Sequence, residues 1–140
     1  KKINEIMNKR LNWTEFMPFA PCTLDKRAKD YFLNCKNSDV SSQFMTATYH
    51  VNPNKIKEID AVVHVDNTAR PQIVTKENNT SLYKIFMYFD ELTGIGCLVN
   101  TSFNLQKEPI VNNLIDVLRS LMQGPVDVLA IENFLVSPIK

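Results

Sequence analysis

Apolar and polar positions along the 140-residue chain follow two different periods, and the period predicts the element that each segment forms. Helices are expected over residues 1–11, 26–33, 81–92 and 112–124. The pattern is clearest in residues 81–92, where Leu82, Ile85, Phe86 and Phe89 recur at helical spacing. Candidate boundary residues are Asp25, Asn52 with Pro53, Gly94, and Gly124 with Pro125.

Segments rich in β-branched and aromatic residues predict the strands. We expect strands over residues 44–51, 61–65 and 126–136, and a short buried strand with a polar tip in residues 95–104. Residues 34–43 are polar and predict a loop. Helices and strands alternate without repeats, which indicates an α/β fold, bordering on α+β, with one mixed, twisted sheet flanked by helices.

Length and charge narrow the class of protein. A chain of 140 residues fits a single domain, residues 1–140. The first residues read as if within a helix and lack an initiator Met, so a fragment of a longer protein is expected. The net charge of +1 gives no electrostatic reason to expect nucleic acid. No apolar run reaches about 18 residues, so no membrane span is expected.

The cysteines and histidines indicate no metal site in this domain. Cys22, Cys35 and Cys97 form no CxxC pair and no ligand cluster with His50 or His64. An odd, scattered set of cysteines is typical of reduced thiols, which indicates a cytoplasmic protein.

Two predicted strand ends carry unusually many hydrogen-bonding side chains. The first is "HVDNTARP", residues 64–71, and the second is "NTSFN", residues 100–104. Ligands bind beyond strand ends in open α/β sheets, and Arg70 offers a planar cation suited to phosphate or carboxylate. Purely structural roles are the alternative: residues 100–104 could form a polar turn, and Asp66 could form a structural ion pair with Arg70. His64, among valines, is expected to be a hydrogen-bonded core residue.

Common phosphate-binding and nucleophile motifs are missing from the sequence. The chain contains no Walker loop, no GxGxxG and no nucleophile elbow. With three glycines in 140 residues, a glycine-rich phosphate cradle is excluded.

Three motifs together resemble one family, the O-carbamoyltransferases related to nodulation and antibiotic-tailoring enzymes. "HVDNTARPQ" resembles the family's HVDGTARPQ motif, and "FMPFAPCTLDKRAKDYF" resembles its FRPFAPS-x-L-x-E…YF. "LTGIGCLVNTSFN", followed by "KEPIV", resembles TG-x-P-x-L-x-NTSFN-x-x-GEPIV. The motifs occur in family order over nearly the whole chain, and they match the family's C-terminal domain.

This resemblance implies a YrdC-like α/β domain that forms an adenylate. In the family, ATP and carbamoyl phosphate are thought to give carbamoyl-adenylate, and a Kae-like N-terminal domain transfers the carbamoyl group to an acceptor hydroxyl. The resemblance therefore implies ATP, with Mg as its companion, carbamoyl phosphate and an acceptor alcohol as ligands. The metal of the family lies in the N-terminal domain, without which we expect this piece to be inactive.

Site residues follow from the motifs by the same resemblance. It implies that Arg70 contacts phosphate and that Ser102 lies beside the carbamoyl or phosphate group, as the two catalytic residues. The residues implied to line the substrate and nucleotide pocket are Thr68, Asn100, Thr101, Asn104 and Met45. Adenylate formation mainly demands positioning and charge neutralisation, so a site without a His or Cys nucleophile is chemically sensible.

The chain departs from the family pattern at four positions. Met17 stands where the family has Arg, Asn67 and Lys107 where it has Gly, and Gly96 where it often has Pro. The family's GPRALGNRS segment, which supplies further basic contacts, is not found in residues 1–140. These departures keep a second hypothesis open, a non-catalytic YrdC-like module that binds a nucleotide or a partner. RNA binding ranks third because the net charge is near zero.

Overall fold

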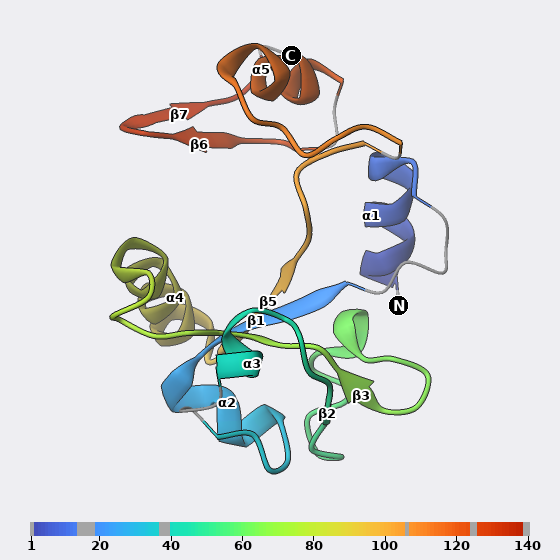
Figure 1. Cartoon of the computed structure of the whole chain (residues 1–140), viewed down its shortest axis with the longest axis vertical. Helices are drawn as coiled ribbons and strands as arrows, with labels where there is room; N and C mark the ends of the chain where they lie inside the picture. The colour runs from blue at the N-terminus through green and yellow to red at the C-terminus, as the bar shows by residue number, and fades with distance from the viewer. Residues whose placement is uncertain (1, 14–18, 37–39, 106, 124–125, 139–140) are drawn as a thin grey trace. The chain divides into compact units, whose positions relative to one another are not determined.

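The computed structural model describes residues 2–13, 19–36, 40–105, 107–123 and 126–138. The chain forms two compact units, each with its own elements (Figure 1). We call Pro18–Thr101 the sheet unit, and Lys1–Met17 together with Ser102–Lys140 the helix–hairpin unit.

A mixed three-stranded sheet forms the centre of the sheet unit. Strand β1 (Ala20–Leu24) pairs in parallel with β4 (Gln72–Val74) and antiparallel with β5 (Cys97–Asn100). All five residues of β1 are buried, as expected for a central strand covered on both faces. The predicted α/β class with a mixed sheet is thereby confirmed, and so is the predicted strand in "CLVN".

Two helices and a short helical turn accompany this sheet: α2 (Asp25–Tyr31), α3 (Val40–Gln43) and α4 (Thr80–Thr93). The Asn79 side chain caps α4 by accepting a hydrogen bond from the Leu82 amide, and Gly94 ends it at φ 73°. Phe86 of α4 packs into a buried cluster with Cys22, Leu24 and Val74. The helix predicted over residues 81–92 is confirmed.

The other expected boundaries are only partly correct. No cap bond is found at the start of α2, where the residue before the helix is Leu24 and Asp25 is already helical. Residues 53–58 form turns instead of a helix that begins at Pro53. The predicted loop, residues 34–43, includes α3, and its residues 37–39 lie outside the described part, as do Gly124 and Pro125.

The predicted strand over residues 61–65 is wrong. Asp60–Val62 form a 3-10 turn, η1, in which Ile59, Ala61 and Val62 are all buried. Burial of neighbouring positions suits a helical turn, whereas a half-buried strand would alternate. Pairing begins later, where β3 (Thr68–Ala69) meets β2 (Tyr49–His50), so the strand expected over residues 44–51 shrinks to its last part.

The helix–hairpin unit contains α1 (Lys2–Leu11), α5 (Leu114–Met122) and a hairpin of β6 (Leu129–Ile131) and β7 (Phe134–Val136). Asn113 caps α5 by accepting from the Asp116 amide. Both helices were predicted, but the single strand expected over residues 126–136 is two strands. Their reversal places Glu132 at φ 49°, a left-handed conformation that a hairpin turn requires and that an apolar pattern does not reveal.

A network around Gly96 joins α2 to the segment between α4 and β5. The buried Tyr31 hydroxyl accepts a hydrogen bond from the Gly96 amide, 3.0 Å, and donates one to Glu58 Oε1, 2.5 Å. The Thr23 hydroxyl donates to the Gly96 carbonyl. A Cβ at Gly96 would lie 2.7 Å from Arg27 Cγ, so only glycine fits without displacing that side chain. A Pro here, as often in the family, would also remove the amide donor.

Two departures from the family pattern lie at left-handed backbone positions. Asn67 has φ 61° and Lys107 has φ 68°, and both replace a Gly of the resembled motifs. Glycine adopts this conformation without strain, asparagine tolerates it, and a long side chain does so at a cost. The backbone geometry thus explains the family's preference, and Lys107 is the more strained of the two replacements.

Tyr31→Phe should lower the free energy of unfolding by about 1–3 kcal/mol, because the buried Gly96 amide loses its acceptor. Burial, and next the bond to Glu58, raises the pKa of Tyr31 to about 12 from 10.0. The stabilisation carried by the neutral phenol is therefore complete below pH 10 and lost as pH rises toward 12. Urea titrations should show a smaller alkaline loss for the variant. Tyr88→Phe, at an exposed position, serves as control, and equal stability of both variants would contradict this role.

Lys107→Gly should stabilise the chain by up to about 1 kcal/mol, because it relieves the left-handed strain, whereas Asn67→Gly should change stability by less than about 0.5 kcal/mol. Lys29→Gly, an exposed position inside α2, is the matched control and should cost about 1 kcal/mol. Urea midpoints measure all three. A loss of stability on Lys107→Gly would show that the left-handed turn is not strained.

Candidate functional site

A compact polar turn precedes β3 in the "HVDNTARP" segment. Asp66 Oδ1 accepts hydrogen bonds from the Thr68 amide, 3.0 Å, and the Thr68 hydroxyl, 2.7 Å. His64 Nδ1 lies 3.1 Å from the same hydroxyl, and the His64 amide donates to the Thr68 carbonyl. The Thr68 bonds hold the pKa of Asp66 below its usual value. His64 is hydrogen-bonded as predicted, but it is half-buried and not a core residue.

Arg70 extends from this turn into solvent. Its neighbours Ala69 and Pro71 are buried, so the backbone is anchored on both sides of an exposed guanidinium. Within the described residues, the Arg70 side chain forms no hydrogen bond or ion pair. The alternative of a structural Asp66–Arg70 pair is therefore not realised, since the carboxylate bonds Thr68 instead. The exposed guanidinium, which has no partner within the described residues, is available to an anion.

The sheet brings the two polar motifs together. Strand β4 begins at Gln72, two residues after Arg70, and the antiparallel strand β5 ends at Asn100. Both positions lie at the same end of the sheet, opposite Cys22 and Ala20 of β1. Asn100 Nδ2 donates to Gln72 Oε1 over 2.7 Å. The sheet thus brings Asn100 of "NTSFN" into contact with Gln72, the residue that directly follows "HVDNTARP".

Met45 completes this cluster, with its Sδ 3.6 Å from Asn100 Nδ2. Cys22 Sγ donates to Gln72 Oε1 over 3.4 Å. Sequence reasoning missed Gln72 and Cys22 as members of the site. Gln72 could have been found from the motif itself, because it follows Arg70 at the spacing that returns a strand side chain to the same face.

The remaining predicted site residues are distributed over both units. Thr101 ends the sheet unit, and its buried hydroxyl has no hydrogen-bond partner among the described residues. Ser102 and Asn104 belong to the helix–hairpin unit. Asn104 Nδ2 donates to the carbonyls of Leu105, 3.2 Å, and Glu108, 3.0 Å, and thereby closes the turn that contains Lys107. Met17, the departure from the family's Arg, lies outside the described residues.

The described residues contain no group of three or more His, Cys, Asp or Glu side chains placed to hold a metal ion. Cys22, Cys35 and Cys97 are free and buried. Burial raises the pKa of both Cys22 and Cys97 to about 12, so these thiols remain protonated and unreactive at neutral pH. None of the helices in the described part of the chain is long and apolar enough to cross a membrane.

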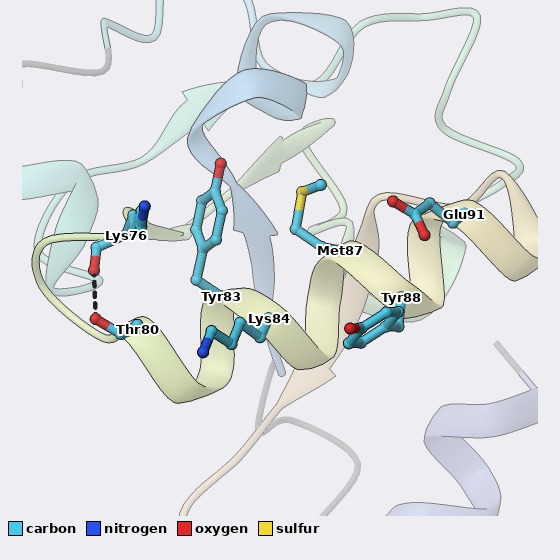
Figure 2. A pocket seen from close by; sticks show the side chains of 7 residues that line it. All are labelled: Lys76, Thr80, Tyr83, Lys84, Met87, Tyr88 and Glu91. Atoms are coloured by element: carbon cyan, nitrogen blue, oxygen red, sulfur yellow. Dashed lines mark hydrogen bonds between the residues drawn. The ribbon is translucent and has the colours of Figure 1, made fainter.

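A groove runs along α4, away from these motifs in the sequence (Figure 2). It has a volume of about 380 Å³ and combines aromatic, thioether and charged side chains. The residues that line it are Lys76, Thr80, Tyr83, Lys84, Met87, Tyr88 and Glu91. None of them was predicted as a site residue, because most lie on the helix face that a periodic pattern assigns to solvent.

Comparison with known proteins identifies the family. The family model described as "Carbamoyltransferase C-terminus" matches residues 1–138. An uncharacterized protein of Methanocaldococcus jannaschii, MJ1051, is 43% identical over 140 residues, which are all of this chain and 26% of that protein. Nodulation protein NolNO of Sinorhizobium fredii is 33% identical over 96% of this chain and 19% of its own length.

Part of the chain is also similar to a relative whose name states an enzymatic activity. The 3'-hydroxymethylcephem-O-carbamoyltransferase of Streptomyces clavuligerus is 38% identical over 61 residues, 44% of this chain and 12% of the enzyme. The chain spans about a quarter or less of the length of the curated relatives it matches. The motif resemblance is confirmed, and the chain belongs to the carbamoyltransferase C-terminus family.

Proposed function

We propose that this chain is the adenylate-forming part of an O-carbamoyltransferase. Water hydrolyses carbamoyl phosphate to carbamate and inorganic phosphate. A carbamate oxygen then bonds to the α-phosphorus of ATP while the bond to pyrophosphate breaks and pyrophosphate leaves. An acceptor hydroxyl then attacks the carbamoyl carbon in the N-terminal part of the full-length protein, and AMP leaves. Family membership supports carbamoyl transfer in general, and the adenylate route is our proposal.

The observation that carries this proposal is the presentation of Arg70. Its guanidinium is exposed and unpaired within the described residues, while Ala69 and Pro71 hold the backbone on either side. ATP and carbamoyl phosphate, the two substrates proposed for adenylate formation, are both anions, and a guanidinium binds phosphate oxygens through two parallel hydrogen bonds. Electrostatic stabilisation by such a group is worth most where the surroundings keep it rigid.

The polar cluster beside Arg70 suits the binding of neutral groups. Asn100, held by Gln72, offers an amide, and Met45 offers an adaptable apolar surface for the nucleotide. We assign Thr68 to fixing the turn below Arg70 and Thr101, with its unpaired buried hydroxyl, to a ligand oxygen. Ser102 and Asn104 follow directly in the chain, and we propose that Ser102 contacts the carbamoyl or phosphate group.

The raised pKa of Cys22, the thiol described beside Gln72 and Asn100, agrees with a reaction that needs no cysteine nucleophile. Adenylate formation joins two substrates and needs no covalent enzyme intermediate, so positioning and charge neutralisation suffice. The thiol of Cys22 lies near Asn100 through Gln72, but its pKa of about 12 keeps it neutral. A cysteine nucleophile would need a lowered pKa.

Arg70→Ala in the full-length protein should reduce carbamoyl-phosphate-dependent pyrophosphate release by about 100-fold or more, because the positive charge that contacts the anionic reactant is lost. Arg70→Lys should recover only part of the rate, since an ammonium cannot form the paired bonds. Arg119→Ala is the matched control, because its charge is already engaged by Glu108 and Asp116. Unchanged pyrophosphate release in Arg70→Ala would refute the assignment. Calorimetric titration with ATP would then distinguish a module that binds without turnover.

Ser102→Asp should abolish pyrophosphate release, because a second negative charge beside an anionic reactant is repelled, whereas Ser102→Ala should lower it by about tenfold or less. Thermal unfolding of both variants checks that the fold is kept. Lys107→Asp, at an exposed position in the same unit, is the control for the effect of an added negative charge. If Ser102→Asp turns over normally, Ser102 lies away from the reactants.

A further inference from the structure

One face of α5 is apolar and exposed. Leu114, Leu118 and Met122 follow one another at four-residue intervals, and Ile115 lies beside them on the same arc. Their exposed fractions are 57% for Leu114, 79% for Ile115, 41% for Leu118 and 76% for Met122. We call these four residues the outer face of α5.

The opposite side of α5 already packs within its own unit. Leu121 is 3% exposed and Ser120 is 1% exposed, and Val117 lies partly buried on the same side. The polar sector is narrow and is occupied by Asp116 and Arg119, which form an ion pair at 3.5 Å. The apolar sector is therefore wider than the helix needs for packing in this unit alone. Such a helix is typical of one covered on two sides.

The hairpin of the same unit also exposes large apolar side chains. Phe134 and Leu135 are adjacent on β7, so their side chains point to opposite faces, and their exposed fractions are 68% and 78%. A two-stranded hairpin is only marginally stable without a surface to pack on. The buried large apolar side chains described in this unit are Leu11, Leu121 and Leu129, so few of its described apolar side chains are shielded from solvent.

Two findings identify what covers the outer face of α5. The matched relatives are about four times as long as this chain, and the matched segment is their carbamoyltransferase C-terminus. The chain enters this unit through α1, which begins at Lys2 and belongs to the same unit as α5. The first helix of the chain therefore belongs to the unit that carries the outer face of α5.

We propose that the N-terminal part of the full-length carbamoyltransferase chain packs on the outer face of α5. The contact is mainly apolar, because Leu114, Ile115, Leu118 and Met122 offer no charge. It anchors the helix–hairpin unit, which carries Ser102 and Asn104, to the part of the protein that precedes it. This inference rests on the family membership and does not depend on the proposed reaction.

Thiol labelling provides the test, since the native cysteines are buried and two have a pKa of about 12. Met122→Cys and, as a second variant, Ile115→Cys are prepared in the full-length protein and in the 140-residue chain. Leu92→Cys, 86% exposed on α4 of the other unit, is the matched control. The rate of reaction with a maleimide is measured at low protein concentration.

In the full-length protein, Met122→Cys and Ile115→Cys should react about tenfold or more slowly than Leu92→Cys, because a packed interface must open first. In the 140-residue chain the three rates should be similar. Equal rates in the full-length protein would overturn the proposal. Slow labelling that is already present in the 140-residue chain would overturn the proposal as well. If that protection disappears when the protein is diluted, the face is covered by a second copy of the chain. Activity does not enter this readout, so its outcome is independent of the proposed reaction.

Discussion

The backbone of Gly96 is the constraint on which the sheet unit depends. Its amide donates to Tyr31, its carbonyl accepts from Thr23, and the Arg27 side chain packs where a Cβ would stand. Arg27 in turn donates to the Gly94 carbonyl, 3.2 Å, and pairs with Asp90 near the end of α4. One residue without a side chain thus ties α2, α4 and the first residue of β5 together. Buried backbone amides and carbonyls form hydrogen bonds in this way because an unpaired buried group costs more free energy than ordering the residues that pair with it.

The position of β5 follows from this anchor, and the candidate site follows from β5. With Cys97 held opposite Thr23, the strand reaches Ala20 at Asn100 and ends there. Strand β4 runs parallel to β1, so its first residue, Gln72, lies at the same sheet end. The 2.7 Å contact between Gln72 and Asn100 is therefore a consequence of register, and it joins the first residue of β4 to the last residue of β5. A shift of one residue in β5 would turn Asn100 to the other face.

The family pattern and the backbone geometry explain each other at several positions. Gly is preferred where Asn67 and Lys107 stand because the chain is left-handed there, and such conformations are costly for most side chains. At Gly96 this chain uses a backbone amide as a donor to Tyr31, and a proline at that position would lack the donor. The exposed outer face of α5, by contrast, reflects no local rule. We propose that it is a contact surface of a longer protein, and the chain spans about a quarter of the length of its Methanocaldococcus jannaschii relative MJ1051.

By itself, the sequence determined helices α1, α2, α4 and α5, the α/β class and the family. Helical periodicity over α1, α4 and α5 is a local property, and the three motifs are strings of residues that need no coordinates to be recognised. The tertiary structure alone decided that residues 60–62 form a 3-10 turn, that the last strand is a hairpin, and that Asp66 bonds Thr68 and leaves Arg70 free of that pair. These outcomes depend on contacts between residues distant in sequence or on single left-handed positions, and neither leaves a period in the chain. Gln72 and Asn100 meet for the same reason, because strand register is a property of the sheet and not of either segment.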